Sequence, residues 1–256
     1  MTNAAAPRSH LGTHDVFNQP EPAYRDPWAQ DESLRRLLGS DAGLGALGAA
    51  IATPEIREAA RDAQTILPQL RSFDRSGRRL DEVHFHPGYH RMMQLGMEAG
   101  YAATAWDGTG NHARHAAISY MLAQIEPGVC CPMTMTYAAV PALNANPDLA
   151  ALWQPRLMAR AYDPARISVD RKGSATLGMA MTEKQGGSDV RANATIAVKD
   201  GEGYRLKGHK WFCSAPMCDG FLTLAQLDGA ISCFLVPRWL PDGTRNPFTI
   251  LRLKDK

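Results

Sequence analysis

The sequence lacks an excess of charge of one sign, because 28 lysine and arginine residues face 26 aspartate and glutamate residues. The formal net charge of +2 excludes a chain whose whole surface attracts nucleic acid or an anionic membrane. No apolar run approaches the roughly 18 residues that a membrane-spanning helix needs, and residues 1–22 contain no continuous apolar stretch typical of a secretory signal. These absences predict a soluble protein of the cytoplasm without a membrane partner.

Cysteine is also scarce, and its spacing excludes two common structural uses. The five cysteines are an odd number and include no C-x-x-C pair, so they fit neither a disulfide framework nor a zinc finger. They are Cys130, Cys131, Cys213, Cys218 and Cys233. A G-x-S-x-G nucleophile elbow is absent as well, which argues against an α/β-hydrolase. We therefore expect reduced thiols, no metal site and no nucleophilic serine.

The 256 residues divide into three stretches of different pattern. Residues 1–30 carry four prolines among polar residues, which predicts an extended N-terminal arm. Residues 31–170 repeat apolar side chains at helical spacing, and Pro54 and Pro87 mark two expected helix starts. Residues 171–256 alternate with a period of two, which predicts strands. A helical domain followed by a β-domain indicates an α+β fold.

Five strands are expected in the β-domain, and their turns predict an antiparallel sheet. The expected strands are Thr176–Met181, Ala194–Val198, Tyr204–Phe212, Phe221–Gln226 and Ser232–Val236. Residues 200–203 and 228–229 have the composition of tight hairpin turns. Residues 247–256 look like a further strand with no element after it. Because a complete sheet covers its edges, we expect the β-domain to be truncated at its C-terminus.

Two stretches match known ligand-binding motifs but lack the neighbouring residues or elements that those motifs need. Residues 43–48 fit G-x-G-x-x-G, but a charged, helix-like stretch precedes them where a dinucleotide-binding turn needs a strand. A helix or loop of small residues is the favoured interpretation. His84, His86 and His90 lie within seven residues, yet no Cys or Glu completes an accepted set of metal ligands. We interpret them as residues at a helix entry and on the surface.

Residues suited to ligand binding are concentrated in two segments of the β-domain. In residues 181–190 a strand ends in Thr182, consecutive glycines allow close approach of the backbone, and Ser188 adds a hydroxyl. In residues 208–215 two aromatic residues precede Ser214, a combination that could cover a ring and bind its polar edge. A planar heterocycle or a phosphate-bearing ligand fits this composition. A tight turn and aromatic core packing explain it as well, so both interpretations stay open.

Together the two segments resemble the flavin-binding β-domain of the acyl-CoA dehydrogenase family. MTEKQGGSDV at 181–190 is similar to the family's Gly-rich flavin loop, and GHKWFCSA at 208–215 stands in the place of its second flavin strand. The chain further resembles the branch of this family that is connected with the bacterial response to DNA alkylation. The segments that carry this narrower resemblance are FNQP at 17–20, GRRLDEVHFHP at 77–87, CPMTMTYAA at 131–139, LVPRWLPDGTRN at 235–246 and RLKDK at 252–256.

The resemblance implies that the protein binds FAD non-covalently. Met179, Met181 and Thr182 would lie along the pyrimidine side of the isoalloxazine, with Thr182 hydrogen-bonded to its polar edge. Phe212 would take the stacking position, where many family members have Trp, and Ser214 the hydroxyl position near N5, where many have Thr. The implied cofactor site also includes Gly187 and Ser188, towards the ribityl pyrophosphate or the substrate, and Cys213 in the second strand.

The resemblance also implies a reaction and partners. The ancestral chemistry is FAD-dependent α,β-dehydrogenation of an acyl-CoA thioester, which needs a carboxylate base. The family places that base, and this branch its DNA-contacting surface, in a C-terminal region beyond Lys256. We therefore expect no catalytic residue here, do not assign Glu183 as the base, and expect DNA as a partner only through that region. A homotetramer is implied. A catabolic short- or branched-chain acyl-CoA dehydrogenase and an inactive fragment remain alternatives.

Overall fold

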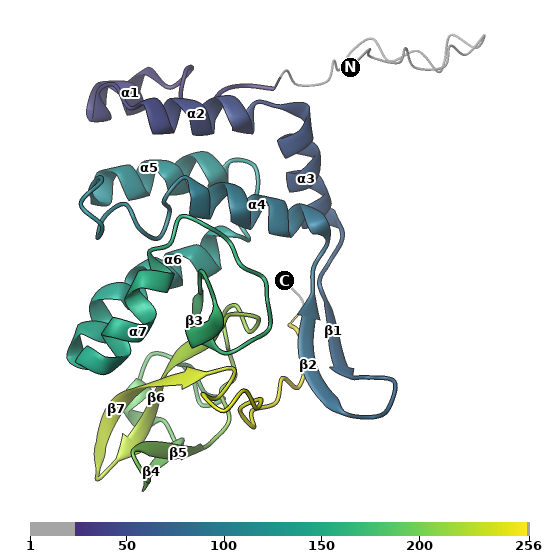
Figure 1. The fold of residues 1–256 in the computed structure, drawn as a ribbon, viewed down its shortest axis with the longest axis vertical. Helices are drawn as coiled ribbons and strands as arrows, with labels where there is room; N and C mark the ends of the chain where they lie inside the picture. Colours follow the sequence, from purple (N-terminus) through teal and green to yellow (C-terminus); the bar gives the residue numbers. More distant parts are fainter. Residues whose placement is uncertain (1–23, 255–256) are drawn as a thin grey trace.

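The computed structural model describes residues 24–254, in which a helical part lies against a sheet and a hairpin projects beside both (Figure 1). Most of the predicted arm over residues 1–30, the FNQP segment and the last two residues of RLKDK therefore lie outside the described residues. The α-helices are α1 Glu32–Leu38, α2 Ala42–Ile51, α3 Pro54–Thr65, α4 Pro87–Glu98, α5 His112–Ala123, α6 Cys130–Ala142 and α7 Pro147–Leu157. Short 3-10 turns lie at Leu143–Ala145, Val169–Arg171 and Val190–Ala192.

Helix starts are fixed by side chains that accept hydrogen bonds from the first free amides of each helix. Thr53 caps α3, His86 caps α4 and Asn111 caps α5. Proline also stands in the first turn of α3 and α4, where its missing N–H costs nothing. The predicted starts at Pro54 and Pro87 are confirmed.

The core of the helical part lies between α2, α4, α5 and α6. Side chains of this core that are at most 1% exposed include Ile51, Met92, Met97, Ile118, Met121, Leu122 and Met133. The G-x-G-x-x-G stretch lies within α2, and Gly48 packs so closely on Trp28 that an added Cβ would come within 2.6 Å of the Trp28 Cβ. The interpretation of this stretch as a helix of small residues is confirmed, because its glycines serve helix packing.

A two-stranded hairpin interrupts the helical part between α3 and α4. β1, Gln69–Phe73, pairs antiparallel with β2, Arg79–His84. Asp74 holds the turn, because its carboxylate accepts hydrogen bonds from the amides of Ser76 and Arg78. The sequence pattern does not predict this hairpin, since the strands are short and mostly polar.

The second half of the chain forms a five-stranded sheet, and the α+β class is confirmed. The strands are β3 Leu177–Ala180, β4 Ile196–Asp200, β5 Gly203–Lys207, β6 Gly220–Leu227 and β7 Ala230–Pro237. β4–β5 and β6–β7 are antiparallel hairpins at the two predicted turns. The sheet is mixed rather than wholly antiparallel as predicted, because β3 and β4 each pair parallel with β6. Long segments join these parallel partners, as parallel pairing requires.

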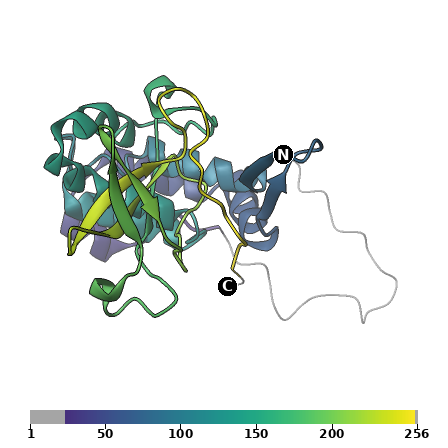
Figure 2. The same cartoon turned by 90° about the horizontal axis from the view of Figure 1, so that it is seen from below.

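The stretch at 247–254 forms no strand, contrary to the prediction for residues 247–256. Figure 2 shows this yellow segment running from the sheet towards the hairpin. The Ile250 amide donates to the carboxylate of Asp81 at 3.2 Å, so a side chain rather than a neighbouring strand holds this backbone. Asp81 is fully buried at 0% exposure and also pairs with Arg79 at 2.8 Å and Arg245 at 3.1 Å. We call these contacts the Asp81 clasp, to which Arg238 adds a bond to the Asp81 carbonyl.

None of the helices in residues 24–254 is long and apolar enough to cross a membrane.

We expect Asp81→Asn to destabilise the protein strongly. The substitution keeps the size of the side chain but removes the charge that two arginines face, and breaking a buried ion pair costs about 3 kcal/mol. Urea unfolding at pH 7 measures the change in the free energy of unfolding. The matched control is Asp200→Asn, whose exposed pair with Arg205 should matter by less than about 0.5 kcal/mol. Equal effects of the two substitutions would contradict the structural role of the clasp.

Candidate functional site

The two segments singled out in the sequence lie against each other. The amide of Ser214 donates to the carbonyl of Met179 at 3.0 Å, and the amide of Trp211 donates to the carbonyl of Thr182 at 2.8 Å. β5 ends at Lys207, so the predicted strand Tyr204–Phe212 is too long. The residues after Lys207 leave β5 and pair with the end of β3 instead.

The bridge places Met179 opposite Ser214, and the second bond lies three residues further along each segment, so the pairing between the two bonds is irregular. Residues directly opposite each other share a face, and alternate residues of a strand share it too. Met179 and Ser214 therefore share a face, and Met181 and Phe212 lie close by in the same two segments. Phe212 is 41% exposed and Ser214 is exposed, so this face is open to a ligand.

The side chain of Thr182 lies against the glycine loop. A Cβ added at Gly187 would come within 2.9 Å of the Thr182 hydroxyl oxygen. Among the described residues no hydrogen-bond partner is recorded for the hydroxyls of Thr182, Ser188 and Ser214, or for the amides of Gly187 and Ser188. The loop and the paired segments together thus offer several donors to a polar ligand.

A buried carboxylate fixes the loop to the second segment. Glu183 is 5% exposed and accepts from Lys210 at 2.8 Å, from the amides of Ala194 and Thr195, and from the Thr195 hydroxyl at 2.5 Å. Burial alone would raise the pKa of Glu183, but the bonds from Lys210, Thr195 and Ala194 outweigh it and lower the pKa from 4.5 to about 2. Glu183 is therefore ionised, and its carboxylate is fully engaged in hydrogen bonds.

Cations lie over both aromatic residues of the second segment. Trp211 is 39% exposed and has Lys184 and Arg252 over its ring at 5.5 and 5.6 Å from the centroid. Lys254 lies 4.2 Å from the centroid of Phe212 and covers one face of that ring. The sequence pattern does not predict these cations beside the aromatic rings, because only the folded chain brings residues 252–254 here.

Cys213 is half-buried, whereas its neighbours Phe212 and Ser214 are exposed. Burial raises the pKa of its thiol to about 12, against the opposing field of Arg238, so the thiol is protonated at neutral pH. In the described part of the chain, which contains all five cysteines, every one is free. No group of three or more His, Cys, Asp or Glu side chains suited to a metal ion is found within residues 24–254.

The three clustered histidines have separate local roles. His86 accepts from the Gly88 amide at the start of α4, and His84 lies on β2 beside Glu82. His90, within α4, bonds to the Tyr162 hydroxyl at 2.8 Å. The interpretation as helix-entry residues is confirmed for His86, whereas His90 is half-buried rather than on the surface.

Comparison with known families and proteins adds to this geometry. The family described as the adaptive response protein AidB N-terminal domain matches residues 18–164, and the acyl-CoA dehydrogenase middle domain matches residues 178–256. The chain is 43% identical to the putative acyl-CoA dehydrogenase AidB of Escherichia coli, over 96% of this chain and 48% of that protein. It is 34% identical to acyl-CoA dehydrogenase family member 11 of Caenorhabditis elegans, over 94% of this chain and 42% of that protein.

Two solved structures share the fold over nearly the whole chain. The apo form of Bd2924 matches with a TM-score of 0.80 and 31% identity, covering 94% of this chain and 51% of that one. Caenorhabditis elegans ACDH-11 in complex with C11-CoA matches with a TM-score of 0.78 and 29% identity, covering 98% and 45%. The chain spans about half the length of the relatives that it matches.

Glu183→Gln should destabilise the protein by about 2 kcal/mol at pH 7, because Lys210 then stays buried without its carboxylate partner. The Glu183 pKa is lowered on folding, so its contribution is complete above about pH 5 and is lost as the pH falls from 4.5 towards 2. Urea unfolding between pH 7 and pH 3 should therefore show the difference between wild type and variant shrinking on acidification. Glu32→Gln, in an exposed pair with Arg36, is the matched control. A difference that does not change with pH would be incompatible with this account.

Proposed function

This chain belongs to the acyl-CoA dehydrogenase family, in its AidB-like group, and we propose that it carries the isoalloxazine-binding edge of an FAD site. The observation that supports the proposal is the pairing of residues 179–182 with residues 211–214. This pairing brings Met179, Met181, Phe212 and Ser214 together beside the glycine loop, with Phe212 and Ser214 exposed.

The residues of this site fit a flavin in shape and in polarity. The methionines and Phe212 offer an apolar surface to a flat ring, with the Phe212 face opposite Lys254 left for stacking. Ser214 would donate its hydroxyl to the ring edge, and Thr182 would do so from the side of Gly187. The amides of Gly187 and Ser188 have no partner within residues 24–254 and could bind a phosphate or ribityl oxygen.

Bound FAD would supply hydride acceptance to the oxidation of an acyl-CoA thioester. The chain's own part in that reaction is to hold the ring, through Phe212 and Ser214, and to keep the loop in place through Glu183 and Lys210. A thioester substrate is supported by the complex of ACDH-11 with C11-CoA. The base is proposed to lie outside residues 1–256, as the resemblance implies.

The wider role follows from the group and is proposed for the whole protein. The match to the AidB N-terminal domain favours a part in the response to DNA alkylation over an ordinary catabolic dehydrogenase. Contact with DNA through a C-terminal region and assembly as a homotetramer belong to the same proposal. If short or branched acyl-CoA thioesters rapidly bleach the flavin bound to the whole protein, the catabolic alternative is favoured.

The FAD site is tested by titrating the purified chain with FAD and following the flavin absorbance and fluorescence. Phe212→Ala should raise the dissociation constant about tenfold through lost stacking. Ser214→Ala should raise it about fivefold and shift the flavin spectrum, because one hydrogen bond to the ring is removed.

The control variant is Tyr204→Ala. Tyr204 is an exposed aromatic residue on β5 whose ring lies beneath the Lys199 ammonium, and it is not part of the paired segments. Its dissociation constant for FAD should equal that of the wild type. If the wild-type chain takes up no FAD, or if all three variants bind it equally well, the proposed cofactor site is wrong.

A further inference from the structure

The glycine loop, residues 184–192, connects β3 to β4, and side chains close it at both ends. Glu183 stands before the loop, and its carboxylate accepts hydrogen bonds from two main-chain amides that follow the loop. Asn193, which is 3% exposed, makes a second closure, because its side-chain amide donates to the carbonyl of Met181 at 2.9 Å. The two ends of the loop are therefore tied together twice.

The Asn193 side chain also holds the loop itself. Its carbonyl oxygen accepts a hydrogen bond from the side-chain amide of Gln185 at 3.0 Å, directly before the consecutive glycines. The main-chain carbonyl of Asn193 accepts from Gln226 on β6 at 3.1 Å, and its amide donates to the carbonyl of Val190 at 3.2 Å. Because every polar group of this buried residue is engaged, Asn193 anchors Gln185 to the sheet.

The loop offers hydrogen-bond donors and positive charge rather than apolar surface. The amides of Gly187 and Ser188 have no recorded partner in the described part of the chain, and consecutive free amides in a turn suit an anion. Lys184 is exposed, and among the described residues no carboxylate pairs with it, since the adjoining Glu183 is engaged with Lys210. These groups favour the phosphates of a cofactor over its ring.

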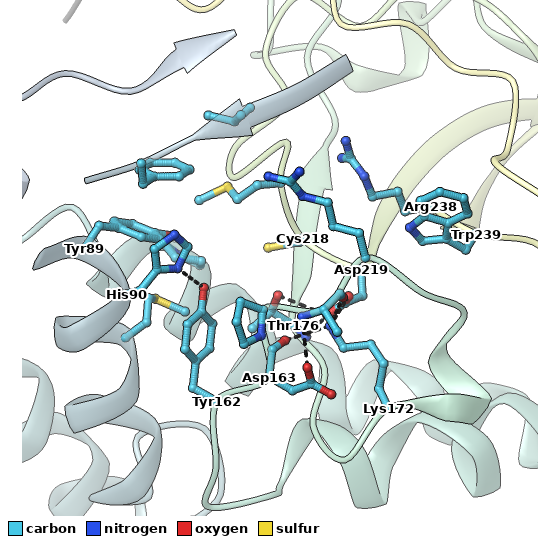
Figure 3. A pocket seen from close by; sticks show the side chains of 18 residues that line it. Tyr89, His90, Tyr162, Asp163, Lys172, Thr176, Cys218, Asp219, Arg238 and Trp239 are labelled. Carbon is cyan, nitrogen blue, oxygen red and sulfur yellow. Dashed lines mark hydrogen bonds and ion pairs between the residues drawn. The ribbon is translucent and has the colours of Figure 1, made fainter. Parts of the chain in front are cut away.

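The cavity drawn in Figure 3 is separate from this arrangement. It lies between α4, β2 and the start of β6, and none of its lining residues belongs to residues 181–195. Its Lys172 and Asp219 side chains pair with each other at 2.6 Å. Substitutions in the glycine loop therefore leave the lining of this cavity unchanged.

On the basis of the proposed FAD site, we propose that Gln185 and Asn193 are positioning residues, which hold the glycine loop in the conformation that binds the ribityl-phosphate part of FAD. A loop that is ordered before the ligand arrives loses less conformational entropy on binding, so the bond between these two side chains should raise the affinity. It should do so only for ligands that carry the ribityl-phosphate part, because the ring is assigned to Phe212 and Ser214.

The test compares FAD with lumiflavin, which has the ring of FAD but neither its ribityl chain nor its phosphates, in fluorescence titrations of the purified chain. Gln185→Met keeps the length of the side chain but removes its N–H donors. It should raise the dissociation constant for FAD about fivefold and leave that for lumiflavin unchanged. Phe212→Ala should raise both dissociation constants, since stacking holds the ring in either ligand.

The matched control is Gln154→Met, the same substitution in the helical part. Gln154 lies on α7 and makes the same kind of bond, because its side-chain amide donates to the side-chain carbonyl of Asn144 at 2.7 Å. This variant should bind FAD and lumiflavin with the affinities of the wild type.

A second measurement shows whether the bond acts through the loop. The amides of Ala192 and Asn193 donate to carbonyls of the loop, and their hydrogen exchange should be faster in ligand-free Gln185→Met than in the wild type. Wild-type affinity of Gln185→Met for FAD, an equal loss for both ligands, or unchanged exchange would each overturn the inference while the FAD site stands. If the wild-type chain binds neither ligand, the FAD site itself is wrong and the inference falls with it.

Discussion

The antiparallel contact between the end of β3 and residues 211–214 is the constraint on which the candidate site depends. It needs a very close approach, because a Cβ at Gly178 would lie 2.6 Å from the carbonyl oxygen of Ser214. It also needs an anchor, which the Glu183–Lys210 pair supplies from the adjoining loop. Two main-chain bonds thus hold the two segments together, and the bridge between Met179 and Ser214 puts these two side chains on one face.

The sequence predicted those features of the fold that depend on interactions within a few residues. Helix starts at Pro54 and Pro87 could be read from the sequence because a cap and a proline act within one turn. The hairpin turns at 200–203 and 228–229 were equally clear, because their residues supply the turn conformations by themselves. The composition of residues 181–190 and 208–215 already indicated a ligand site. How the two segments pair is seen only in the fold, where the end of β3 contacts the residues after β5.

The features that sequence reasoning missed all depend on partners far apart in the chain. The parallel pairing of β3 with β6 joins residues about 43 positions apart, for which no turn gives a signal. The polar strands β1 and β2 carry no apolar alternation, and residues 247–254 read as a strand although their amide at Ile250 bonds to a side chain. The hydrogen bonds of Asn193 to Met181 and Gln185 could not be inferred from a motif, because burial and partners exist only in the fold.

The Asp81 clasp has a consequence for how the molecule opens. It ties β2 of the hairpin to Arg238 and Arg245, which follow the sheet, and so connects the first half of the chain to the second through a buried charge. Neither half can fray without exposing that charge network to water. Amide exchange in the hairpin and in the loop after β7 should therefore give the same opening free energy. The two regions would then open as one cooperative unit rather than independently.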